Sequence, residues 1–99
     1  MTNAAPAVKL ADAALAQTKK ATRAAFGATL AELADAGVPV VAVDADLTGS
    51  TTTAAFAAAS PEYAKRLFNC GIAEQNMVDV AAGLALTGHV AFTGSFAVF

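Results

Sequence analysis

The amino-acid sequence predicts an α/β fold in which a mostly parallel β-sheet is flanked by helices. Two segments carry apolar residues at helical spacing, and three short segments are apolar runs typical of buried strands. The two kinds of segment alternate from residue 22 to residue 96. This alternation favours a parallel sheet, because two parallel strands need a long crossover that is usually a helix.

A helix followed by a buried strand is predicted for the first half of the domain. In residues 22–36, three apolar side chains share one helix face: Phe26, Leu30 and Leu33. Thr22 is a candidate N-cap, and Gly37 suits the left-handed position that ends many helices. Residues 38–43 are apolar and rich in valine, which is typical of a strand buried on both faces. A polar loop is expected over residues 48–53.

The second half continues the alternation. Residues 54–59 are expected to form a short helix, and Pro61 suits the first position of another helical turn. Residues 66–70 and 90–96 are the second and third predicted strands. Between them, residues 74–86 predict a helix that Gly88 closes. The apolar face of this helix has four members: Met77, Val80, Ala81 and Leu84.

Composition and charge exclude several kinds of partner. Hydrophobic residues make up 57% of the chain, but 28 of the 99 residues are alanine, which buries little area. The net charge is −2 and the basic residues form no stripe, so we expect no nucleic-acid partner. No apolar run reaches the roughly 18 residues of a membrane span. The single cysteine, Cys70, has no disulfide partner or Cys/His cluster, which predicts no metal site and fits a cytoplasmic location.

The chain divides into a short arm and one domain that we expect to be incomplete. Residues 1–20 are rich in alanine and contain Pro6, which favours a flexible arm. Residues 21–99 hold all the periodic segments. The sequence stops at residue 99, three residues after the strand-like run of residues 90–96, without a turn or polar cap. We therefore expect a fragment or a subunit of a larger assembly.

Three polar segments are candidates for ligand binding. They span residues 44–53, 69–76 and 94–99, and each follows or ends a predicted strand. The carboxyl ends of parallel strands meet at one edge of a sheet, and open α/β sheets bind their ligands there. Periodicity alone therefore predicts an α/β ligand-binding domain, with carboxylates, hydroxyls and aromatic rings at that edge.

Linked motifs spread over residues 21–99 point to a known enzyme family. They are ATR at residues 21–23, DADLTGS at 44–50, FNCGIAEQNMV at 68–78, AAGLALTG at 81–88 and FTGSFAVF at 92–99. In this order they resemble the pyrimidine-binding domain of transketolases, most closely the small, C-terminal subunit of split transketolases. The resemblance implies the thiamine-diphosphate-binding fold. It also implies an enzyme of the pentose phosphate pathway that moves two-carbon ketol units between sugar phosphates.

The resemblance implies that Glu74 is the catalytic residue. In the family, the glutamate of the GIAE motif hydrogen-bonds N1′ of the thiamine diphosphate pyrimidine and shares its proton. Phe96 and Phe99 match aromatic positions around that ring, and Asp46 matches an aspartate close to the cofactor. Other roles stay open for these residues: a solvated first-turn glutamate, ordinary core aromatics, and an aspartate that caps a turn.

Substrate and partner follow from the same resemblance. Arg23 and Ser50 match positions that bind the terminal phosphate of the sugar, although Arg23 alone is also consistent with a solvated helix residue. The family's metal-binding motif is missing from this sequence. The resemblance therefore implies that an N-terminal, diphosphate-binding domain or subunit holds Mg²⁺ and the diphosphate. We expect the chain to work within a homo- or hetero-oligomer and to have no activity alone.

Other functions are compatible with part of the pattern. 1-Deoxy-xylulose-5-phosphate synthase and the β subunit of 2-oxo acid dehydrogenase E1 share the GIAE core, but the following QNM, the DADL loop and the SFAVF end suit transketolase better. A non-catalytic remnant that keeps the fold is the alternative from another class.

Overall fold

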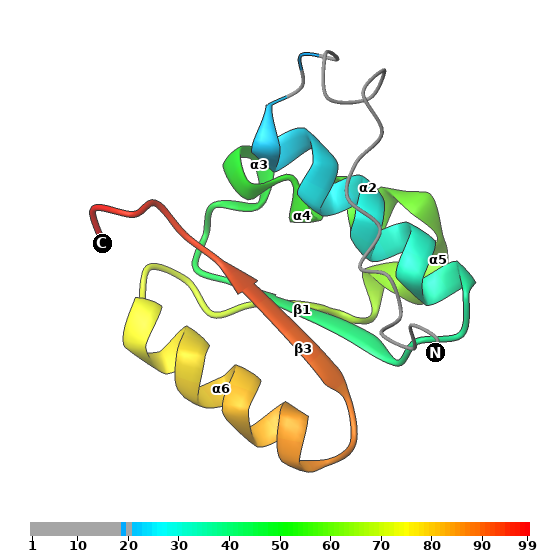
Figure 1. The fold of residues 1–99 in the computed structure, drawn as a ribbon. Helices are drawn as coiled ribbons and strands as arrows, with labels where there is room; N and C mark the ends of the chain where they lie inside the picture. The colour runs from blue at the N-terminus through cyan, green and yellow to red at the C-terminus, as the bar shows by residue number, and fades with distance from the viewer. Residues whose placement is uncertain (1–18, 20) are drawn as a thin grey trace, which may run out of the picture.

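The computed structural model describes residue 19 and residues 21–99, so the arm predicted for residues 1–20 lies, apart from residue 19, outside the described residues. Helices and strands alternate along the domain (Figure 1). The elements are α2 (Thr22–Asp35), β1 (Val40–Asp44), α3 (Thr48–Thr51), α4 (Thr53–Ala59), α5 (Pro61–Ala64), β2 (Leu67–Asn69), α6 (Glu74–Leu86) and β3 (Val90–Gly94). Within residues 21–99, no helix has both the length and the apolar character needed to cross a bilayer.

The three strands form one parallel sheet with β1 in the centre, in the order β2-β1-β3. Helix α6 covers one face of this sheet, and α2 and α4 lie on the other face (Figure 1). The predicted α/β class is therefore confirmed. Because helices cover both faces, every residue of β1 is buried.

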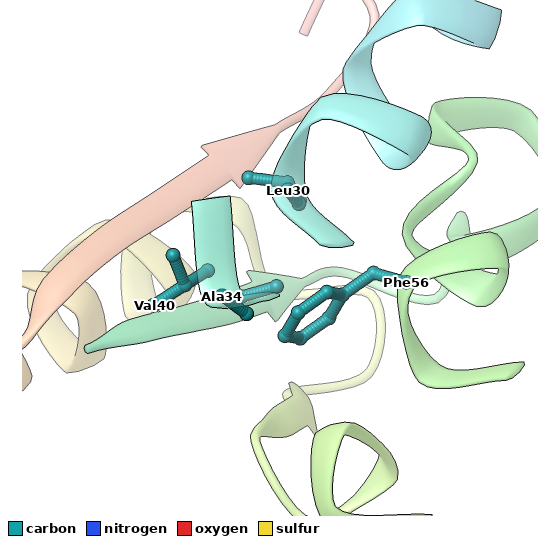
Figure 2. Packing of buried hydrophobic residues seen from close by; sticks show 5 residues of the cluster. Leu30, Ala34, Val40 and Phe56 are labelled. Carbon is teal, nitrogen blue, oxygen red and sulfur yellow. The ribbon is translucent and has the colours of Figure 1, made fainter. Parts of the chain in front are cut away.

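Alternate side chains of β1 enter two different cores, because successive residues of a strand point to opposite faces. The core on the side of α2 and α4 has five buried members: Leu30, Ala34, Val40, Ala42 and Phe56 (Figure 2). Phe26 and Leu33 pack against it, which confirms the predicted face of the first helix. The ring of Phe56 is fully buried and stacks on Tyr63 of α5 at a centroid distance of 5.2 Å.

The second core lies between the sheet and α6. Its buried members are Val43, Ala45, Met77 and Ala81, and Cys70, Val80 and Leu84 pack against them. The apolar face predicted for residues 74–86 is therefore confirmed, and α6 has the predicted bounds. Val78 and Leu86 lie outside this face and are exposed.

Some local predictions are wrong. Residues 48–53 are not a loop, because α3 forms there and α4 begins at Thr53. Thr22 is not the N-cap of α2: Ala21 occupies the cap position, with extended backbone and no side-chain hydrogen bond. The first strand begins at Val40 rather than residue 38, because the Val40 N–H donates back to the Val38 carbonyl at 2.8 Å in a tight turn.

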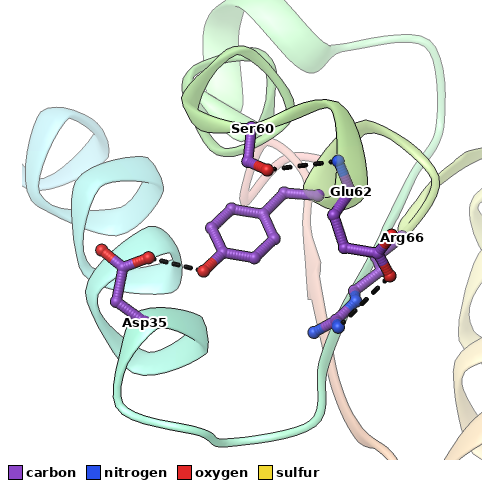
Figure 3. A network of polar contacts seen from close by, with 5 residues as sticks. Asp35, Ser60, Glu62 and Arg66 are labelled. Atoms are coloured by element: carbon purple, nitrogen blue, oxygen red, sulfur yellow. Dashed lines mark hydrogen bonds and ion pairs between the residues drawn. The ribbon is translucent and has the colours of Figure 1, made fainter.

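A polar network beside the first core ties α5 to the end of α2 (Figure 3). The Tyr63 hydroxyl donates a hydrogen bond to the Asp35 carboxylate, and the Arg66 guanidinium lies 5.6 Å from the centre of the Tyr63 ring. Arg66 also pairs with Glu62 at 3.5 Å. The hydrogen bond to Asp35 is the main cause that raises the pKa of Tyr63, with desolvation and the negative charge of Asp35 adding to it.

Candidate functional site

All three strands end at the same level, so the segments that follow them share one edge of the sheet. Asp44, the last residue of β1, is in register with Asn69 of β2 and with Gly94 of β3. The three polar segments predicted from the sequence therefore begin side by side. Parallel α/β sheets bind ligands at this edge.

One pocket at this edge brings Arg23, Ser50 and Phe96 together, from α2, α3 and the segment after β3. We call it the Arg23 pocket. Its volume is about 380 Å³, and its other lining residues are Thr22, Phe26, Thr51, Thr93, Gly94 and Ser95. Arg23 is exposed and Ser50 is half-buried. A guanidinium and a hydroxyl from two different elements form a donor set that suits an anionic oxygen group such as phosphate.

A second pocket contains Glu74, the first residue of α6. This Glu74 pocket has a volume of about 640 Å³ and is lined by Ala73, Glu74, Gln75, Asn76 and Phe99. Glu74 is half-buried, and within residues 21–99 no cation pairs with its carboxylate. The first turn of a helix favours a negative charge. A carboxylate and an aromatic ring in one pocket can hold a flat heteroaromatic ligand and share a proton with a ring nitrogen.

An aromatic pair connects the two pockets. Phe96 lines the Arg23 pocket and Phe99 lines the Glu74 pocket, and their ring centroids are 5.8 Å apart with the planes tilted by 41°. Phe96 is 46% exposed and Phe99 is 70% exposed, so both rings have surface free for a ligand. Phe92 differs from them, because it packs on the first core and meets Phe26 edge-on.

Asp46 lines neither of these pockets. Its side chain is exposed, and its N–H donates to Asn69 Oδ1 at 2.9 Å. Asn69 Nδ2 donates back to the Asp46 carboxylate at 3.3 Å, and the N–H of Gly71 donates to the same Asn69 oxygen at 2.9 Å. Asp46 and Asn69 thus join the loop after β1 to the loop after β2. A place for Asp46 beside a cofactor stays a prediction.

The buried carboxylate of Asp44 organises the segment that carries Ser50. Its Oδ1 accepts the N–H of Leu47 at 2.6 Å, at the start of α3. Its Oδ2 accepts the hydroxyls of Thr51 at 2.6 Å and Thr53 at 2.8 Å. The sequence leaves open that Asp46 caps this turn, but the residue that accepts the capping hydrogen bond is Asp44. The same bonds explain why Thr48–Thr51 are helical and α4 begins at Thr53, since they satisfy polar groups that would otherwise favour a loop.

Sequence reasoning missed some of the residues that build the site. Phe26 was assigned to a helix face in the core, yet it also lines the Arg23 pocket. Asn69 joins two loops, and an asparagine at the end of a strand is a signal for such side-chain-to-backbone bonds. Nothing in the sequence distinguishes Thr52 from its neighbours Thr51 and Thr53, although its contacts differ from theirs.

A parallel sheet with an anion-suited pocket and a carboxylate–aromatic pocket at its carboxyl edge defines the class of this protein, an α/β ligand-binding domain. Comparison with known families then identifies the family to which this domain belongs. Residues 18–99 match the family described as transketolase, pyrimidine binding domain, and the chain belongs to this family.

Similar proteins carry the same family name. The chain is 50% identical over 80 residues to a Methanocaldococcus jannaschii protein whose name assigns it to the C-terminal section of a transketolase; the match covers 81% of this chain and 24% of that protein. It is 42% identical over 82 residues to human transketolase, covering 82% of this chain and 13% of the enzyme. For human transketolase-like protein 2 the identity is 41% over 95 residues, covering 95% and 14%. The matched region is thus a quarter or less of each relative's length.

Proposed function

We propose that this chain supplies the pyrimidine side of a thiamine diphosphate site in a transketolase-type enzyme that transfers two-carbon ketol units between sugar phosphates. One observation carries the proposal. Glu74 and Phe99 line one pocket, Arg23 and Ser50 line the next, and the pair Phe96 and Phe99 connects the two. A cofactor ring and a phosphorylated substrate would then have adjoining places at the edge of the sheet.

The residues of the Glu74 pocket fit an aminopyrimidine ring. When bound, thiamine diphosphate supplies the electron sink that ketol transfer needs. The Glu74 carboxyl would hold and share a proton at the ring nitrogen N1′, and the exposed ring of Phe99 would orient the pyrimidine by stacking. Glutamine at position 74 would keep a hydrogen bond but could not exchange that proton.

The Arg23 pocket would select phosphorylated sugars. Arg23 offers a planar pair of donors and Ser50 offers a hydroxyl, which together match the oxygens of a terminal phosphate. Because this pocket is separate from Glu74, its residues would act on substrate binding more than on the proton at the cofactor.

The proposal includes a partner. Within residues 21–99, no group of three His, Cys, Asp or Glu side chains lies close enough to hold a metal ion. We propose that a diphosphate-binding transketolase domain or subunit holds Mg²⁺ and the cofactor diphosphate, in a cytoplasmic oligomer. The active site would then form only where the two units meet.

The test of the cofactor site uses the chain assembled with its diphosphate-binding partner. In Glu74→Gln, exchange of the cofactor C2 proton with solvent deuterium should slow by a factor of about 10² to 10⁴, the usual contribution of a positioned acid–base group. The matched control is Glu32→Gln, an exposed glutamate on α2, which should exchange at the unaltered rate. Equal exchange rates in both variants would remove Glu74 from the proposed role.

Two further measurements test the phosphate pocket and the partner. Arg23→Ala should raise KM for a phosphorylated ketose about 10- to 100-fold, the value of a charge-assisted hydrogen bond, with a smaller effect on the unphosphorylated sugar. Lys65→Ala is the control, because Lys65 is an exposed cation at the end of α5. Calorimetric titration with thiamine diphosphate and Mg²⁺ should give heat only when the partner is present. If the assembled complex gives none, the chain is a non-catalytic remnant.

A further inference from the structure

Three consecutive threonines at the junction of α3 and α4 make contacts in two opposite directions. Thr51 and Thr53 turn inward and donate their hydroxyls to the buried carboxylate of Asp44. Thr52, between them, turns outward and meets α2. The segment that follows Ser50 is therefore held on both sides, by the centre of the sheet and by the first helix.

The Thr52 hydroxyl bridges two backbone groups of α2. It accepts the N–H of Gly27 at 2.9 Å and donates to the carbonyl of Arg23. In a regular α-helix these two groups would pair with each other, because residue 27 follows residue 23 by four. Thr52 thus contacts the start of α2 at Arg23, the residue whose side chain lines the Arg23 pocket.

Two unusual local features make this contact possible. Thr52 has a left-handed backbone with φ of 69°, which is uncommon for a β-branched residue and persists only where the surroundings hold it. A Cβ atom at Gly27 would lie 2.1 Å from the Thr52 carbonyl oxygen. Only glycine at position 27 allows the two segments to approach this closely.

We propose that Thr52 is a positioning residue that sets the distance between Arg23 and Ser50 and thereby the affinity for the substrate's terminal phosphate. This inference rests on the proposed function of the Arg23 pocket. Ser50 lies two residues before Thr52, and the Arg23 carbonyl is one of the two groups that Thr52 bonds. Loss of the hydroxyl frees α3 from the start of α2, so the two sides of the pocket separate. Glu74 lies in the other pocket, on α6, and keeps its place.

The test compares substitutions at Thr52 in the assembled enzyme with a phosphorylated ketose and its unphosphorylated counterpart. Thr52→Val removes the hydroxyl and keeps the shape. It should raise KM for the phosphorylated sugar about five-fold, as expected if separation of Arg23 from Ser50 weakens one hydrogen bond to the phosphate. Both kcat and KM for the unphosphorylated sugar should change by less than about two-fold, because the proton-sharing group is untouched. Thr52→Ser keeps a hydroxyl at this position, so its KM should equal that of the wild type.

A direct structural measurement accompanies the kinetics. Hydrogen exchange at the Gly27 amide should accelerate in Thr52→Val and return to the wild-type rate in Thr52→Ser, because the amide loses and regains its acceptor. Thr87→Val is the matched control, since Thr87 also donates its hydroxyl to a helix carbonyl, that of Leu84 at 2.6 Å, but at the far end of α6. It should alter none of these values.

A second variant covers the case in which valine at position 52 prevents folding. Thr52→Gly removes the hydroxyl and also relieves the left-handed backbone, so it should fold and show the same selective rise in KM. The inference is overturned if both sugars lose affinity equally or if neither does, while Arg23→Ala still discriminates against the phosphorylated sugar. If Arg23→Ala does not discriminate, the phosphate pocket itself is wrong and the role of Thr52 falls with it.

Discussion

The substitution Gly27→Ala gives a stringent test of the contact between α2 and the segment after α3. On helix propensity alone, alanine in place of a glycine inside a helix stabilises a protein by about 1 kcal/mol. At Gly27 the added Cβ would lie 2.1 Å from the Thr52 carbonyl oxygen and 2.7 Å from Thr52 Oγ1. Both atoms belong to a residue that is held in place on either side, so the contact can be relieved only if the two segments move apart.

The expected magnitude follows from these opposing effects. Forcing an additional carbon into a packed contact costs about 1–3 kcal/mol. Separation of the segments also weakens the hydrogen bond from Gly27 to Thr52, worth about 1 kcal/mol. After subtraction of the gain in helix propensity, we expect Gly27→Ala to lower the free energy of unfolding by about 2 kcal/mol. For a domain of this size, that corresponds to a fall in Tm of roughly 10 °C.

Gly83→Ala provides the matched comparison. Gly83 lies inside α6, and a Cβ there would meet nothing within 4 Å. The same chemical change should therefore raise stability by about 0.5–1 kcal/mol. Thermal denaturation of both variants, followed by circular dichroism, should show shifts in Tm of opposite sign. If both variants gain stability, the close approach of Thr52 to α2 does not exist in the protein and the reasoning about this contact is refuted.

Three further predictions concern the buried carboxylate, the first core and the network beside it. Asp44→Asn should lower the free energy of unfolding, measured in urea, by about 2 kcal/mol, because the hydrogen bonds from the Thr51 and Thr53 hydroxyls would no longer go to a charged acceptor. A loss below about 0.5 kcal/mol would contradict this. Phe56→Ala empties a fully buried site and should cost about 3–5 kcal/mol in the same assay, and a cost near that of a surface change would place the ring outside the core. Tyr63→Phe should show its effect through pH. The pKa of Tyr63 is raised in the folded protein, so its contribution is complete below about pH 10, the pKa of an unperturbed tyrosine, and is lost as pH rises through the higher folded value. The Tm of the unmodified protein should therefore fall toward that of the variant above pH 10, and a gap that stays constant to high pH would contradict the assigned cause.

The sequence predicts the fold well where local signals and packing agree. Residues 74–86 combine a regular apolar face with a closing glycine, and α6 has the predicted bounds. The first strand is recognised by its run of valines, and its burial on both faces follows from its central place in the sheet. Parallel pairing follows from the alternation of elements, because each crossover contains helix.

The predictions that failed depend on contacts between residues distant in the sequence, or on telling apart neighbouring residues of the same type. Helix α3 depends on Asp44, whose buried carboxylate collects bonds from Leu47, Thr51 and Thr53, and no periodicity reports such a bond. Of the site, the motifs led to Arg23, Ser50 and Glu74, and the fold shows which of them share a pocket. The contact of Thr52 with Gly27 joins residues 25 positions apart and has no local signature.

The position of β1 in the sheet has a consequence for synthesis of the chain on the ribosome. Both neighbours of β1 are encoded after it, and its last pairing, of Asp44 with Gly94, joins residues 50 positions apart. At about 5–20 residues per second, the valine-rich strand waits several seconds for its second neighbour to be made. During that interval the apolar strand is exposed on the nascent polypeptide and can aggregate. Slower translation or a lack of chaperones should therefore reduce the yield of folded protein more than in a protein whose central strand is made last.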